Sequence, residues 1–182
     1  MKPKPPEDAG DASQAETRRQ LLEAAGEVFA EAGFRDATVR EICRRAGANI
    51  AAISYHFGDK EKLYAEVLRY SQKKALEKYP LVPDVGPDAT PEKKLRAFVH
   101  SLLLRIFDKG SAGWHGKMML REMVEPSAAL DLLVEERIRP LAGQIWQIVA
   151  DILGCPLNHE RVRLCAFSVV SQCVFYHHCR PL

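Results

Sequence analysis

The side chains most able to do chemistry in this chain lie between residues 49 and 56, in the string NIAAISYH. The string combines small side chains with one hydroxyl, one phenol and one imidazole, which are groups that hydrogen-bond to bases and phosphates. Small side chains also let a helix enter the DNA major groove, which is roughly 12 Å wide, where apolar groups can meet a thymine methyl. The first chemistry that these residues indicate is therefore the reading of double-stranded DNA.

Two short helices are needed to hold this string in a groove. Thr38 is a favoured N-cap, and Glu41 three residues later can complete a capping box, so the first helix is expected to begin at Val39. Gly47 can adopt the left-handed conformation that ends a helix, and Asn49 is a strong N-cap for the second helix. The spacing predicts a helix-turn-helix unit.

The two faces of the second helix are expected to differ. Ile53 and Phe57 share the side that packs against the first helix, whereas the opposite side carries small residues and one aromatic. On the first helix, Arg44 and Arg45 are expected to reach solvent or phosphate. We assign DNA contact to Thr38, Arg40, Asn49, Ala51, Ala52, Ser54, Tyr55, His56 and Lys60.

A helix-turn-helix pattern alone also occurs as a helical hairpin in an all-α core, so the pattern by itself does not decide the function. The fuller string is more specific, because several of its elements follow one another in a fixed order. It resembles the N-terminal domain of TetR-family transcriptional regulators in Gly33-Phe34, Thr38, Ile42, Ala46-Gly47, Ile53, Tyr55-His56-Phe57 and Lys60-Glu61-Lys62-Leu63. One departure is Ser54, where many relatives carry a Tyr that touches the DNA backbone.

The resemblance implies roles for individual side chains. Arg40 and Tyr55 would contact bases, whereas Thr38, His56 and Lys60 would contact phosphates. Without the resemblance, the same residues would be read as a helix cap, an exposed aromatic and solvated charges. The two interpretations differ only in whether DNA binds there.

The charge of the chain restricts how it could hold DNA. Its 182 residues carry a formal net charge of +2 at pH 7, and a hydrophobic content of 47% is that of an ordinary globular protein. Such a chain is not a polycation that binds nucleic acid indiscriminately. We therefore expect a homodimer that reads two half-sites of an operator about one helical turn, or a multiple, apart, with binding that weakens as salt rises.

The sequence gives no sign of export or of a membrane partner. It has no basic N-terminal region followed by an apolar run and a cleavage site, and no stretch of about 18 uncharged apolar residues. A cytoplasmic location is expected, where the five cysteines would remain reduced thiols. Cys173 and His177 are the only pair with sensible metal-ligand spacing, and we predict neither a metal nor a cofactor.

Three segments are expected along the chain. Residues 1–14 are rich in Pro, Gly and Asp and predict a disordered tail, and residues 15–62 form the helix-turn-helix DNA-binding domain with a bracing helix from 15 to 32. Residues 63–182 form a helical effector-binding and dimerisation domain, entered through a helix at 60–78 and a proline-rich linker. No strand pattern occurs, so the fold class is all-α.

Helix boundaries in the second domain follow from caps and prolines. Thr90 and Pro91 should open a helix that Gly110 and Gly113 close. A helix after Ser127 should bend at Pro140, and the final helix should run from Asn158. In TetR-family proteins two such C-terminal helices form the dimer interface, and we expect this chain to end after one of them.

Met and Trp side chains cluster within the second domain. Methionine adapts to irregular shapes and tryptophan offers a flat apolar wall, so a small-molecule effector could bind among them. The alternative is that these apolar positions belong to the plain core. His100, Arg105 and Arg121 could add polar groups to the effector site, or they could lie on a solvated face. The expected lining is Phe98, Leu102, Trp114, Met118, Met119, Met123, Trp146 and Phe175.

The segment REMVEPS at residues 121–127 also resembles the effector domain of the CecR-like subgroup of the TetR family, which responds to drug-like or other small molecules. The favoured function is a sequence-specific transcriptional regulator, a repressor relieved by a small-molecule effector. One rival is a DNA-binding protein of the same fold that a protein partner regulates. A small helical enzyme using His and Cys is the other, but no catalytic motif supports it, and we predict no enzymatic activity.

Overall fold

The computed structural model describes residues 8–81, 85–86, 88–108 and 113–179. Throughout these ranges the regular structure is helical, which confirms the predicted all-α fold. The first helix, α1 (Asp8–Asp36), begins before residue 15, so residues 8–14 are helical and not the tail predicted for them. Residues 1–7 lie outside the described ranges.

In the reading domain α1 packs against α2 (Val39–Ala46), and the short helix α3 (Ala51–His56) adds Ile53 to the core that they share. Gly33 interrupts α1 with a φ of 79°, a conformation that only glycine adopts without strain. The turn places Phe34 beside the Phe29 and Tyr64 rings, whose centroids lie 4.8 Å apart in an edge-on arrangement. The aromatic cluster fixes α1 against the helix that follows α3.

Helix α4 (Lys60–Lys78) joins the two domains. Its N-cap is Asp59, whose carboxylate accepts the backbone N–H of Lys62 at 2.7 Å. The helix buries Leu63, Val67 and Leu68 and continues without interruption across residues 62 and 63, where the sequence places a domain boundary.

The C-terminal domain contains α5 (Pro91–Phe107), α6 (Gly113–Val124), α7 (Ala128–Leu133), the π-helix η1 (Val134–Ile138), α8 (Arg139–Leu153) and α9 (Glu160–His178). The predicted start of α5 is confirmed, because Thr90 caps it and Pro91 is its first residue. Gly113 begins α6 and does not close α5, while Gly110 lies in the part of the chain that is not described.

Two further helix boundaries differ from expectation. The helix predicted to run from Ser127 through Pro140 is divided into α7 and α8 by a π-helix just before the proline, which widens the backbone where the proline cannot donate a hydrogen bond. Helix α9 begins at Glu160, because the His159 ring and not Asn158 accepts the N–H of Arg161, at 3.2 Å.

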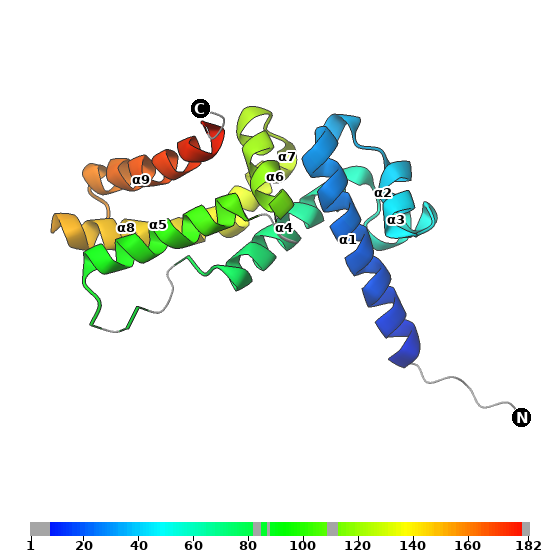
Figure 1. Ribbon diagram of the computed structural model, residues 1–182, viewed down its shortest axis with the longest axis horizontal. Helices are drawn as coiled ribbons and strands as arrows, with labels where there is room; N and C mark the ends of the chain where they lie inside the picture. The colour runs from blue at the N-terminus through cyan, green and yellow to red at the C-terminus, as the bar shows by residue number, and fades with distance from the viewer. Residues whose placement is uncertain (1–7, 82–84, 87, 109–112, 180–182) are drawn as a thin grey trace, which may run out of the picture.

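Two apolar cores result from this order of helices. The first core is formed by α1, α2, α3 and α4, together with Met118 of α6 and Leu133 of α7. The second core is formed by α5, α8 and α9. Figure 1 shows α6 and α7 between the reading domain and the layer formed by α5, α8 and α9. Among the described helices, none is long and apolar enough to cross a membrane.

Candidate nucleic-acid interface and ligand cavity

The turn between α2 and α3 is held by side-chain and backbone caps. Thr38 Oγ1 accepts the N–H of Glu41 at 3.2 Å, and Gly47 ends α2 with a φ of 63°. Asn49 Oδ1 accepts the N–H of Ala51 at 2.9 Å, but the N-cap position of α3 is Ile50, one residue after the predicted Asn49. The other half of the expected capping box is wrong, because the Glu41 carboxylate binds arginines instead of turning back to residue 38.

Helix α3 presents two different faces. Ile53 and Phe57 are 2% and 7% exposed and pack into the reading-domain core. Ala51, Ser54 and Tyr55 lie outward, and the Tyr55 side chain is 71% exposed. Ala52, which the sequence places on the same outward face, is half-buried against the core and leaves only part of its surface available.

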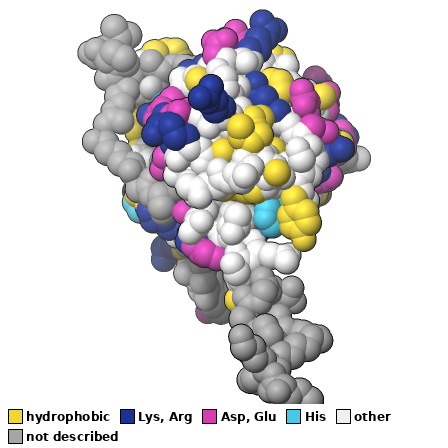
Figure 2. Space-filling model, turned by 90° about the vertical axis from the view of Figure 1, so that its right-hand side faces the viewer, with side chains coloured by type: hydrophobic (Ala, Val, Ile, Leu, Met, Phe, Trp, Pro, Cys, Tyr) yellow, Lys and Arg dark blue, Asp and Glu magenta, His cyan; other side chains and the backbone are white. Residues whose placement is uncertain are grey.

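An ion-pair network occupies two arginines of α2. Arg45 binds Glu41 at 2.8 Å and Glu31 at 2.7 Å, and Arg44 binds Glu41 at 2.7 Å. These hydrogen bonds, first from Arg44 and then from Arg45, lower the pKa of Glu41 to about 2. Figure 2, which views the reading domain end of the molecule, shows Lys and Arg side chains interspersed with Asp and Glu. Arg40 is exposed and lies outside this network.

Two of the side chains assigned to phosphate contact, Lys60 and His56, already have contacts within the protein. Lys60 donates to the Arg35 carbonyl at 3.1 Å and lies 4.8 Å from the centre of the Phe34 ring. His56 is half-buried beside the Tyr55 ring, at 4.9 Å between centroids. These contacts tie the Lys60 and His56 side chains to the end of α1 and to α3, so a phosphate would meet partly positioned groups.

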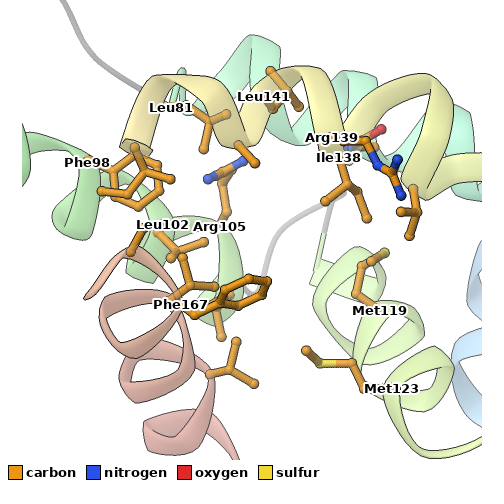
Figure 3. Close-up of a pocket in the computed structure, with 18 of the residues that line it drawn as sticks. Leu81, Phe98, Leu102, Arg105, Met119, Met123, Ile138, Arg139, Leu141 and Phe167 are labelled. Atoms are coloured by element: carbon orange, nitrogen blue, oxygen red, sulfur yellow. The ribbon is translucent and has the colours of Figure 1, made fainter. Parts of the chain in front are cut away.

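A cavity of about 650 Å³ lies between α5, α6, α8 and α9. Each helix contributes a stripe at helical spacing, such as Gly116, Met119 and Met123 on α6. Met119 and Met123 project from α6 toward Phe167 of α9 across the open space (Figure 3). Apolar side chains form most of the wall, which is typical of small-molecule sites.

Five of the eight side chains assigned to effector contact line this cavity: Phe98, Leu102, Met119, Met123 and Trp146. The other three lie elsewhere. Met118 is fully buried in the reading-domain core, and the Trp114 ring packs on α1 at Gly26. Phe175 is 64% exposed on α9, because its position on that helix faces away from α5 and α8.

The polar part of the lining went largely unassigned from the sequence. Arg105 extends into the cavity from α5, and burial lowers the pKa of its guanidinium to about 10. His115 also lines the cavity, and burial, followed by the Arg105 charge, lowers the pKa of its ring to about 4. Its Nδ1 lies 2.8 Å from Ser71 Oγ on α4. The spacing of Arg105 from Phe98 and Leu102, seven and three residues, was the signal that could have placed it on their face.

Helix α6 contacts the reading domain with the face opposite the cavity. Arg121 donates to the Glu31 carbonyl at 2.8 Å, at the end of the regular part of α1. Glu122 is 1% exposed, and its carboxylate accepts the hydroxyl of Tyr64 on α4 at 2.5 Å. Its other oxygen accepts the N–H and hydroxyl of Ser127, at 3.0 and 2.9 Å. One helix therefore forms a wall of the cavity and a support of the reading domain.

Comparison with known proteins agrees with this division. Residues 21–67 match the model of the tetR family of bacterial regulatory proteins, and residues 91–182 match that of the C-terminal domain of the HTH-type transcriptional dual regulator CecR. The chain is 30% identical to CecR of Shigella flexneri over an alignment of 165 residues, which covers 86% of this chain and 74% of that protein. It is 36% identical to the regulator SrpR of Pseudomonas putida over 92 residues, covering 50% of this chain and 40% of that one.

Solved structures show the same fold. AibR, in complex with isovaleryl coenzyme A and operator DNA, has a TM-score of 0.71 at 19% identity and covers 89% of this chain and 86% of its own. A transcriptional regulator of Rhodococcus sp. Rha1 has a TM-score of 0.65 at 25% identity, covering 90% and 85%. The fold and the reading helices define a DNA-binding transcriptional regulator. The chain belongs to the TetR family, with a CecR-type C-terminal domain.

Proposed function

We propose that the protein is a repressor whose grip on its operator is released when a small molecule enters the cavity. The observation that carries this proposal is the double contact of α6. Met119 on one face lines the cavity, while Arg121 and Glu122 on the other bind α1 and α4. A ligand that displaces α6 changes the support of the reading domain.

Release requires that the ligand prefer the conformation that does not bind DNA. The coupling is reciprocal, so the operator weakens ligand binding by the same factor by which the ligand weakens operator binding. A protein partner could exert the same control, but a cavity of about 650 Å³ with an apolar wall favours a small molecule. Catalysis is not part of the proposal, since the family consists of regulators.

The DNA contacts are proposed for the exposed side of α3 and the start of α2. Tyr55 and Arg40 would read bases, and Ala51, Ala52 and Ser54 would allow close approach to the groove. The Thr38 hydroxyl oxygen accepts the N–H of Glu41 in α2, and its hydrogen would remain available to donate to a phosphate. Asn49, His56 and Lys60 complete the set at the edges of the groove.

Two copies of the chain would read the operator together, in the cytoplasm where the DNA lies. The proposal of a dimer is supported by the outer face of α9, because large apolar side chains there are mostly exposed in the described part of the chain. Leu164, Phe175 and Tyr176 are 56%, 64% and 69% exposed. A second copy that covers this face would align two α3 helices on half-sites of one duplex.

The experiment begins with selection of a binding sequence from random duplex DNA by the purified protein. Fluorescence anisotropy then compares wild type with Arg40→Ala on the selected duplex, and Arg96→Ala, an exposed arginine of α5, is the matched control. We expect Arg40→Ala to lose on the order of tenfold or more in affinity and the control to lose almost nothing. Equal affinity of the two variants would refute the assignment of Arg40 to the interface.

A further inference from the structure

The charged groups that line the cavity are of one sign. Arg105, Arg139 and Arg163 contribute to its wall, and none of the described side chains in that wall is acidic. Arg139 is exposed at one side and pairs with Glu135 at 2.8 Å. The cavity thus combines an apolar wall with cationic side chains, of which Arg139 is paired with a carboxylate.

Arg105 is the least satisfied of these groups. Its Nε and one terminal nitrogen, Nη2, are buried and have no hydrogen-bond partner among the residues that the structure describes. Buried donors without partners are costly, and a guanidinium keeps its charge at neutral pH even with the lowered pKa given above. These two nitrogens also lie on the same edge of the guanidinium, where two parallel N–H groups match the two oxygens of a carboxylate.

The neighbouring polar groups do not supply the missing acceptor. Ser71 Oγ donates to the Leu68 carbonyl at 2.8 Å and lies 2.8 Å from His115 Nδ1, so these groups bond to one another, and neither bonds to Nε or Nη2 of Arg105. That ring is neutral at pH 7, because its pKa is about 4. The positive charge of Arg105 therefore faces apolar side chains and a neutral imidazole.

We propose that the cavity binds an amphipathic acid, whose apolar body lies among Leu102, Met119 and Phe167 and whose carboxylate pairs with Nε and Nη2 of Arg105. The proposal rests on the small-molecule control proposed above and names the chemical class of the effector. Figure 3 shows the arrangement that carries it: Arg105 extends toward α8 between Leu81 and Leu141, while Leu102, Phe167 and the two α6 methionines form other parts of the wall of the same cavity. A neutral effector would leave the guanidinium donors unpaired and would bind less tightly.

The test compares acids with alcohols of the same apolar body by isothermal titration calorimetry at pH 7. The probe pairs are decanoate with decan-1-ol and naphthalene-2-carboxylate with naphthalene-2-methanol. Wild type should bind at least one acid on the order of tenfold to a hundredfold more tightly than its alcohol. Arg105→Met should lose this preference and still bind the alcohol, whereas Arg96→Met, an exposed arginine on the same helix, should keep it.

Thermal unfolding without ligand shows that the variant is folded, because removal of an unpaired buried charge should leave the midpoint unchanged or raise it. The proposal is overturned if neither acid binds wild type, if each acid binds no better than its alcohol, or if Arg105→Met keeps the preference for the acid. Operator affinity is measured separately. If wild type does not bind operator DNA, the proposed function as a regulator is refuted. If wild type binds the operator but binds alcohols as tightly as acids, only the proposed ligand class is refuted.

Discussion

Replacement of Gly26 by alanine tests the contact between α6 and the reading domain. A Cβ at Gly26 would lie 2.5 Å from Cε2 and Cζ2 of the Trp114 ring and 2.6 Å from Cη2. Ordinary contact begins at 3.4 Å, so the ring must retreat by about 0.9 Å (3.4 minus 2.5). The ring belongs to α6, and its retreat moves a wall of the cavity.

The free energy of unfolding should reflect two opposing effects. An added methyl in a tight contact costs about 1–3 kcal/mol, whereas alanine in a helix interior is favoured over glycine by about 1 kcal/mol. Gly26→Ala should therefore destabilise the protein by about 0–2 kcal/mol. When Trp114→Leu removes the bulky ring first, the same Gly26→Ala change should stabilise by up to about 1 kcal/mol.

The assay is chemical denaturation of four proteins: wild type, Gly26→Ala, Trp114→Leu and the double variant. The reversal of sign between the two backgrounds is the expected result, with a coupling of about 1–3 kcal/mol. If Gly26→Ala stabilises wild type by as much as it stabilises Trp114→Leu, the ring does not press on α1. The account of α6 as a support of the reading domain would then lose one of its contacts.

Three further changes test separate parts of the structure. Thr38→Ala should cost about 1 kcal/mol by removing the cap of α2, while Thr38→Ser should cost little; equal effects of the two in urea denaturation would contradict the cap. Tyr64→Phe leaves one oxygen of the buried Glu122 carboxylate without its donor and should cost about 1–3 kcal/mol, measured by thermal unfolding; an unchanged midpoint would show that the bond is not formed. The pKa of His115 is lowered from 6.5 in the unfolded chain to about 4 in the folded protein, so the unfolded state takes up the proton first as the pH falls. The free energy of unfolding should therefore decline from about pH 7 and level off below about pH 4. His115→Gln should remove about 2 kcal/mol of the loss between pH 7 and pH 5, and identical pH profiles of the two proteins would mean that the ring is not buried.

Local signals predicted the reading domain well. Thr38 and Gly47 act on the backbone within a few residues, so their roles follow from sequence, and the structure confirms both. The charges of α2 were harder to predict. Arg45 binds Glu31, which is fourteen residues away on another helix, and this pairing depends on how α1 and α2 pack.

The cavity shows the same limit. Helical spacing identifies apolar stripes but does not decide which stripe faces a space and which faces another helix. Met118 and Met119 are adjacent in sequence, yet one is core and the other lines the cavity. Helical spacing puts Arg105 on the same face of α5 as Phe98 and Leu102, but whether that face meets a cavity depends on how α6, α8 and α9 pack around it.

The most direct test of the central claim, that the outer face of α3 reads base sequence, compares two duplexes of equal length. One carries the selected operator and the other a scrambled sequence, and the affinity of wild type and Tyr55→Ala for each is measured by anisotropy at one salt concentration. The account predicts that Tyr55→Ala loses affinity for the operator and keeps its affinity for the scrambled duplex, because phosphate contacts remain. An equal loss on both duplexes, or no loss on either, would contradict it.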